Sequence, residues 1–280
     1  MSCKTCKTKT SNPNGCKNNG VCGTDGCNKL NVFNWLSNLK PISKNSESNY
    51  FEVRFKNGRK KFYENNNENS INIGDPVVVE SSVGFDLGHV TLKGGLISVQ
   101  MKKKKFNPKE KEILKIIRKA NQDDIDLWIK NRDKEEEVMS KSRNIALKLG
   151  LKMKISDVEF QADGKKAIFF YTAKERVDFR KLILEFAHEF RTKVEMKQIG
   201  LREEAGRLGG IGSCGRELCC STWLTDFRVV TTSAARYQQL SLNPQKIAGQ
   251  CGKLKCCLNF ELDQYQDCLL YTSPSPRDEQ

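Results

Sequence analysis

The 280-residue sequence has only two histidines, His89 and His188, and no apolar run as long as the roughly 18 residues of a membrane-spanning helix. The shortage of imidazole argues against catalysis that depends on histidine as acid or base. Neither an H-E-x-x-H motif nor a G-x-x-x-x-G-K-[ST] phosphate loop occurs. The polar N-terminus lacks the apolar stretch of a secretory signal. We therefore expect a cytoplasmic protein that is not an enzyme, has no small-molecule substrate and is not inserted in a membrane.

The chain carries a large excess of positive charge, with 48 lysines and arginines against 34 acidic residues and a formal charge of +14. Such an excess favours an anionic partner, for which nucleic acid is the usual example. The alternative is that the lysines only solvate the surface.

The densest basic run opens a segment ending at Lys119 that has nine basic and two acidic residues. Apolar residues recur here at helical spacing, so we expect a helix with a basic face to begin near Pro108. Phe106 is the only aromatic residue in this segment, which gives no support for base stacking. The run is therefore interpreted either as a patch that contacts RNA phosphates or as a solvated helix face; it consists of Lys102, Lys103, Lys104 and Lys105.

Twelve cysteines are present, and five of them lie in the first 30 residues. Because cytosolic thiols are kept reduced, clustered cysteines there bind metal or sense redox state more often than they form structural disulfides. The N-terminal segment has few large apolar residues and is expected to be disordered unless it is cross-linked. Three of its thiols, separated by glycine-containing turns, are candidates for a second metal site, with a structureless tail as the alternative: Cys16, Cys22 and Cys27.

From Tyr50 onward the sequence alternates in short segments. Tyr50–Phe55 and Lys60–Tyr63 are predicted to form a hairpin, and strands are also expected within the stretch from Val77 to Val90. Several short strands with glycine-rich turns are typical of a small β-barrel.

Further along the chain, the periodicity predicts helix, strand, strand, helix and strand. This order is most of a split β-α-β unit of the ferredoxin-like type. The expected elements are the helix Glu135–Leu149, the strands Lys152–Phe160 and Ala167–Thr172, the helix Asp178–Phe190 and the strand Val194–Ile199.

The predicted fold class is therefore α+β, in five segments. They are a cysteine-rich flexible segment (1–49), a small β-barrel (50–100), a basic helical segment (101–149), an α+β domain with the cysteine motifs (150–267) and a tail (268–280).

Two copies of the pattern C-G-(R/K)-x-x-C-C stand close together near the C-terminus. Identical internal spacing indicates a soft metal centre or a redox switch. Arg207 precedes the first copy and Arg216 lies within it, where they would favour thiolate over thiol, and we also consider them as nucleic-acid contacts. The candidate metal ligands are Cys214, Cys219, Cys220, Cys251, Cys256 and Cys257.

These motifs closely resemble the polymerase-suppressor (PSP) C-terminal-domain family, with its bacterial members of the YaaT/RicT type. The resemblance rests on GGIGSCGRELCCST at Gly209–Thr222, LSLNP at Leu240–Pro244 and GQCGKLKCCL at Gly249–Leu258. It extends from about Tyr50 to Gln266 and does not include the N-terminal cysteines. We interpret the segment from Cys268 onward as atypical of the family and exclude its cysteine from the chemistry.

The resemblance implies a cytoplasmic, non-catalytic regulatory protein. Relatives act with two small helical partners of the Ric type in a complex that holds iron–sulfur clusters. That complex influences RNA processing by ribonuclease Y and developmental signalling. Eukaryotic relatives include RNA-binding proteins, which agrees with the positive charge.

Three chemistries are considered for the paired motifs. Iron–sulfur ligation fits the glycine-rich loops, the cysteine spacing and the resemblance, and a four-iron cluster is the expected cofactor. Zinc is the alternative, although C-x-x-C knuckles are absent from both motifs. A redox switch is the third, but adjacent cysteines form strained disulfide rings. The ligands would be four of the six sulfurs, or those of one motif together with a partner's cysteine. With zinc or a redox switch, the protein would be an RNA-binding module.

Overall fold

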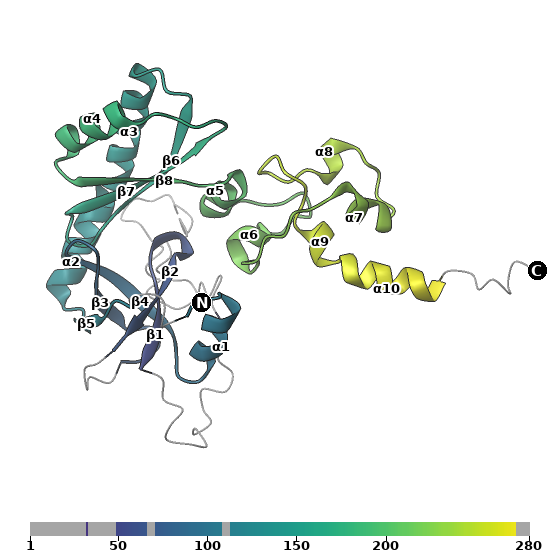
Figure 1. Ribbon diagram of the computed structural model, residues 1–280, viewed down its shortest axis with the longest axis horizontal. Helices are drawn as coiled ribbons and strands as arrows, with labels where there is room; N and C mark the ends of the chain where they lie inside the picture. Colours follow the sequence, from purple (N-terminus) through teal and green to yellow (C-terminus); the bar gives the residue numbers. More distant parts are fainter. Residues whose placement is uncertain (1–31, 33–48, 66–70, 108–112, 273–280) are drawn as a thin grey trace, which may run out of the picture. The chain divides into compact units, whose positions relative to one another are not determined.

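The computed structural model describes residue 32 and residues 49–65, 71–107 and 113–272 (Figure 1). The chain divides into two compact units, the first ending at Ile199 and the second beginning at Gly200. The predicted second metal site at Cys16, Cys22 and Cys27 lies outside the described residues, as does almost all of segment 1–49.

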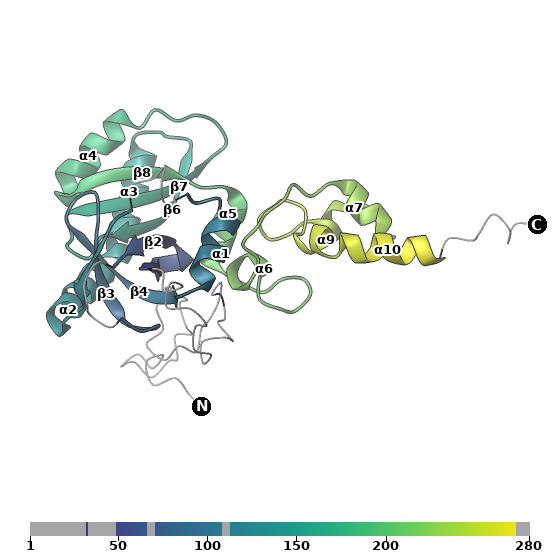
Figure 2. The ribbon, with the colours of Figure 1, turned by 60° about the horizontal axis from the view of Figure 1, so that its bottom comes forward.

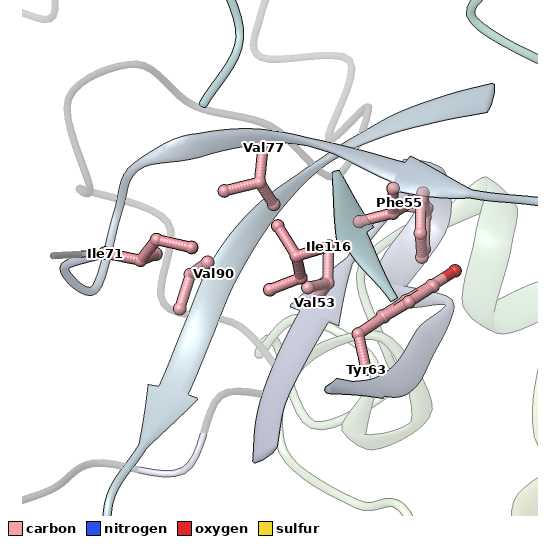
Figure 3. Close-up of a cluster of buried hydrophobic side chains, with 8 residues drawn as sticks. Val53, Phe55, Tyr63, Ile71, Val77, Val90 and Ile116 are labelled. Atoms are coloured by element: carbon pink, nitrogen blue, oxygen red, sulfur yellow. The ribbon is translucent and has the colours of Figure 1, made fainter. Parts of the chain in front are cut away.

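The first unit begins with a five-stranded antiparallel sheet in the order β2-β1-β4-β3-β5. Valines and aromatic residues of these strands form its core, as Figure 3 shows for Val53, Val77, Val90 and Tyr63. The predicted hairpin of the first two strands is confirmed. The elements are β1 (Tyr50–Arg54), β2 (Lys60–Glu64), β3 (Pro76–Glu80), β4 (Phe85–Lys93), α1 (Leu96–Lys103) and β5 (Ile116–Lys119).

This sheet is not the closed barrel that we predicted. Its edge strands β2 and β5 are joined by one isolated bridge between Glu64 and Lys115, whereas a barrel needs a continuous ladder there. The predicted helix near Pro108 is also wrong over Ile116–Lys119. Those residues form β5, because pairing with β3 buries Ile116 in the core and leaves Ile117 exposed. The segment 101–149 therefore contains the end of α1 and a strand of the first sheet before its later helices.

A second, three-stranded sheet completes the first unit (Figure 2). β6 and β7 are antiparallel, and β8 runs parallel to β7 after the crossover helix α4. Helices α3 and α4 supply apolar side chains to its core, where the rings of Phe169 and Phe186 lie 4.7 Å apart. The predicted order of elements and the α+β class are confirmed. The elements are α2 (Gln122–Asp133), α3 (Glu135–Lys148), β6 (Met153–Phe160), β7 (Lys166–Ala173), α4 (Arg180–Phe190) and β8 (Lys193–Gln198).

Ion pairs tie the turn between β1 and β2 to the second sheet. The Lys56 ammonium group donates to Glu135 at 2.7 Å and to Asp157 at 2.9 Å. The Arg59 guanidinium binds Glu159 at 2.6 Å and Asp86 at 3.1 Å. Because these side chains are largely buried, their positions are strongly constrained.

The second unit consists of short helices and tight hairpins around a small core of Ala234, Ala235, Ile247 and Leu258. Its last helix continues past residue 267, so no structural break falls at the predicted start of the tail. Among the described residues, no helix has both the length and the apolar character that a membrane crossing needs. The helices are α5 (Leu201–Leu208), α6 (Cys219–Thr222), α7 (Thr232–Tyr237), α8 (Pro244–Ile247), α9 (Cys257–Phe260) and α10 (Leu262–Thr272).

Candidate functional site

The first cysteine motif folds into a tight hairpin that leads into helix α6. The Gly212 amide donates to the Arg216 carbonyl at 2.7 Å, and the Leu218 amide donates to the Gly210 carbonyl at 3.1 Å. The turn is completed by Gly215 at a φ of 77°, in the left-handed region where a side chain would be strained. The glycine of the motif is therefore required by the turn.

The second motif repeats this hairpin. The Gly249 amide donates to the Lys253 carbonyl at 2.8 Å, and the Lys255 amide donates to the Ile247 carbonyl at 3.0 Å. Gly252 takes the corresponding turn position with a φ of 71°. Each hairpin also has one isolated antiparallel bridge at the equivalent position. The duplicated sequence thus encodes a duplicated local structure, which ends in α6 after the first copy and in α9 after the second.

All six candidate cysteines line one pocket of about 440 Å³ within the second unit. Leu218, Ala248 and Leu254 supply apolar wall, and Arg202 and Lys255 supply positive charge. Cys268, on α10, is exposed and does not line the pocket. The structure therefore gathers the cysteines of the two motifs and leaves the excluded cysteine outside the site.

The thiols influence one another's ionisation. Burial raises the pKa of the Cys220 thiol, and the neighbouring Cys256 and Cys251 add to the shift. Burial also raises the pKa of Cys256, although the Arg202 guanidinium opposes the effect. The pKa of Cys257 is raised by burial and by Glu261. These three thiols are expected to be protonated at neutral pH, so metal binding would release protons.

The arginine at the pocket is Arg202. Its Nη2 atom donates to the Leu254 carbonyl of the second hairpin at 3.1 Å. The predicted Arg207 instead pairs with Glu203 on α5 at 3.3 Å, and Arg216 is exposed. Neither of these two lines the pocket. Arg202 lies within the range of the family resemblance, but no spacing rule connected it to the cysteines.

The donor set fits a soft metal, but the sulfurs do not converge on a single point. Among the residues that the structure describes, no three His, Cys, Asp or Glu side chains are grouped to hold a metal ion. A single zinc ion needs four donors within about 2.0 to 2.3 Å of one centre. An iron–sulfur cluster occupies a larger volume, because its thiolates bind different iron atoms. Among the described residues, the six cysteines therefore line one pocket without forming a ready single-ion site.

The lysine run lies in the other unit. Lys102 and Lys103 are the last residues of α1, and all four lysines are exposed. Lys104 also has a structural role, because its ammonium group binds the buried Glu52 carboxylate at 2.7 Å.

Comparisons with known proteins identify relatives of the chain. The family model described as "PSP1 C-terminal conserved region" matches residues 114–199, and "PSP1-like protein, third domain" matches residues 229–271. The chain is 42% identical over 224 residues to the stage 0 sporulation protein YaaT of Bacillus subtilis, covering 78% of this chain and 77% of that protein. This chain belongs to the PSP1/YaaT family.

A more distant relative is an uncharacterized protein of Schizosaccharomyces pombe. It is 28% identical over 192 residues, which are 59% of this chain and 25% of that protein. No solved structure matches the chain. The second PSP1 match contains the second cysteine hairpin and continues beyond Cys268 to residue 271, whereas the first hairpin lies between the two matched ranges.

Proposed function

We propose that this member of the PSP1/YaaT family is a cytoplasmic, non-catalytic regulatory protein that holds an iron–sulfur cluster between its two cysteine hairpins. The observation that carries the proposal is the gathering of all six motif cysteines around one pocket. When bound, such a cluster supplies one-electron redox chemistry or a structural cross-link. Both hairpins would contribute thiolates, and the Arg202 guanidinium would offset part of their negative charge.

The second unit also has features that support docking of small helical partners. Its exposed apolar side chains include Leu208, Val229 and Phe260, which are 67%, 86% and 60% exposed. A second pocket, of about 720 Å³, has apolar lining together with Arg202, Arg228 and Lys253. This combination suits the apolar face of a helix that has acidic residues at its margin.

Through such partners the protein would act in RNA processing of the ribonuclease Y type or in developmental signalling. The name of the Bacillus relative, a stage 0 sporulation protein, supports the developmental role. In this proposal the cluster is part of a regulatory assembly, and no residue of the chain performs a chemical step on a substrate.

The test is anaerobic purification followed by visible absorption and by iron and sulfide analysis. We expect a brown protein that contains both elements, and we expect Cys214→Ser and Cys251→Ser to lose most of them. Cys268→Ser is the matched control, because this thiol lies outside the pocket. A colourless, iron-free parent after anaerobic reconstitution would refute the cluster. Stoichiometric zinc in its place would support the alternative, an RNA-binding module with a structural zinc site.

A further inference from the structure

A third pocket, of about 370 Å³, lies in the first unit beside the edge strand β2. It brings together residues of β2 and residues that follow α1, although the two segments are far apart in the sequence. Three lysines and three aromatic residues line it: Lys60, Lys61, Phe62, Tyr63, Lys104 and Phe106.

Among the described residues, two lysines of this pocket share one carboxylate. Glu52 is fully buried, and it binds Lys60 at 3.3 Å and Lys104 at 2.7 Å. One carboxylate thus faces two ammonium groups. Lys61 also lines the pocket and is exposed, and its charged neighbours are Arg59, Asp86, Lys166 and Glu195. The exposed lysines of the run before Phe106 extend this positive surface. An anion is therefore the expected ligand.

The aromatic residues define the kind of anion. The Phe106 ring lies 5.2 Å from the ring of Phe62, and it is half-buried. The Lys104 ammonium group lies 5.2 Å from the centre of the Phe62 ring. An accessible aromatic ring among lysines is the combination with which proteins bind single-stranded nucleic acid, because the ring stacks on a base while the lysines contact phosphates.

The sequence alone gave no support for stacking at the lysine run, because Phe106 is its only aromatic residue. The fold packs the buried Phe62 of β2 against Phe106, so that Phe106 is held in place as the ring with an accessible face.

We propose that this pocket binds single-stranded nucleic acid, with one unpaired base stacked on Phe106 and the flanking phosphates contacted by Lys61 and Lys104. Only an unpaired base presents its face for stacking, so duplexes are excluded from this contact. The site lies in the first unit and contains no cysteine, so it goes beyond the cluster function and does not depend on it.

The experiment measures fluorescence anisotropy of a labelled 12-nucleotide oligouridine over a range of salt concentrations. We expect Lys61→Gln to weaken binding and to reduce the salt slope by about 0.7, the value for one lost contact to a single strand. Lys181→Gln, an exposed lysine on α4, is the charge-matched control and should have a smaller effect. We expect Phe106→Ala to weaken binding roughly tenfold and Phe106→Tyr to retain it, because the tyrosine ring can still stack.

Thermal melting of each variant checks that it folds. If Phe106→Ala does not fold, Lys61→Gln still tests the proposal, because Lys61 is exposed and its replacement should not affect folding. Binding of oligothymidine as well as oligouridine would support a general single-strand site, whereas preference for oligouridine would identify RNA. Equal losses for Lys61→Gln and Lys181→Gln would overturn the proposal. It would also fail if duplex RNA or polyglutamate competed as well as oligouridine, because binding would then follow charge alone.

Discussion

The side-chain amide of Gln250 donates a 2.7 Å hydrogen bond to the Ile211 carbonyl, and this bond joins the second cysteine hairpin to the first. Gln250 directly precedes Cys251, and Ile211 lies at the base of the first hairpin. The contact is close, since a Cβ atom at Gly210 would lie 2.7 Å from the Gln250 Oε1 atom. The relative position of the two sets of sulfurs therefore depends partly on one glutamine.

Replacing this glutamine should loosen the pocket without removing a thiol. We expect Gln250→Ala to be destabilised by about 1 kcal/mol, the usual net contribution of such a hydrogen bond. In the metal-free protein, alkylation of Cys251 by iodoacetamide should become faster, which mass spectrometry can follow. In the reconstituted protein, iron should be lost to a chelator several-fold faster. Gln264→Ala, on the exposed part of α10, is the control, and alkylation rates equal to those of the parent would contradict the role of Gln250.

Local features of this fold could be predicted from the sequence because short-range chemistry determines them. The Lys56–Gly58 turn, the α4 helix and the end of α3 before Gly150 each rest on residues within a few positions. Whether the first sheet closes into a barrel could not be predicted, because the answer depends on which distant strands pair. Ile113, Ile116, Ile117 and Ala120 recur at helical spacing, but the burial alternates along the strand, with Ile116 buried and Ile117 exposed. Pairing with β3, which the local sequence does not reveal, determines this alternation.

Lys56 should be essential for the stability of the first unit. Its three partners are Glu135, Asp157 and the Val158 carbonyl at 2.8 Å. We expect Lys56→Met to cost about 3 to 5 kcal/mol at pH 7, because it leaves the buried Glu135 carboxylate without the cation that is hydrogen-bonded to it. Urea unfolding measures the loss, and Lys141→Met, in an exposed pair with Glu137, should change little.

The pH dependence of that loss follows from Glu135. Burial raises the pKa of this carboxyl above its usual value of 4.5, even with Lys56 present to oppose the shift. Removing Lys56 should raise the pKa further, so the ionised carboxylate destabilises the variant at neutral pH. As the pH falls through the raised pKa, Glu135 is protonated and the gap between variant and parent should narrow. A gap that stays constant from pH 7 to about pH 5 would show that Glu135 is not the affected group.

The pKa of Glu52 is shifted downward, whereas that of Glu135 is shifted upward. Burial raises the pKa of this carboxyl, but the charges and hydrogen bonds of Lys60 and Lys104 outweigh burial and hold the pKa below 4.5. Its stabilising contribution is present above the unfolded-state pKa and is lost as the pH falls through the lower folded-state value. We expect Glu52→Gln to cost about 3 kcal/mol near neutral pH. The acid side of its stability curve should be shallower than that of the parent.

The measurement is urea unfolding at a series of pH values from neutral to below the pKa of Glu52. Glu137→Gln serves as the control because Glu137 is exposed. Parent and Glu52→Gln curves that run parallel through the acid range would show that the buried carboxylate is not held ionised.

The cysteine site was also predictable only where residues close together in the sequence determine it. The six sulfurs could be identified from their spacing, and the turn glycines follow from the C-G pair in each motif. Arg202 and Gln250 could not be identified as parts of the site, because each contacts residues far away in the sequence. Arg202 binds the second hairpin and opposes the rise in the pKa of Cys256, and Gln250 binds the first hairpin. The pocket beside β2 was missed for the same reason, since Phe62 comes from β2 whereas Lys104 and Phe106 come from a segment about 40 residues further along the chain.

A substitution at Gly88 tests the pairing of β1 with β4. A Cβ atom at this position would lie 2.5 Å from the Val53 Cγ1 atom and 2.9 Å from the Arg54 carbonyl oxygen. A backbone atom cannot easily move within a paired strand, so Gly88→Ala should cost about 1 to 3 kcal/mol. Gly95→Ala is the matched control, because Gly95 has helical backbone angles and nothing within 4 Å of its added Cβ atom. The control should be neutral or gain about 0.4 to 1 kcal/mol, since alanine restricts the unfolded chain. Urea unfolding of both variants makes the comparison, and equal stability of the two would contradict the close approach of β1 to β4.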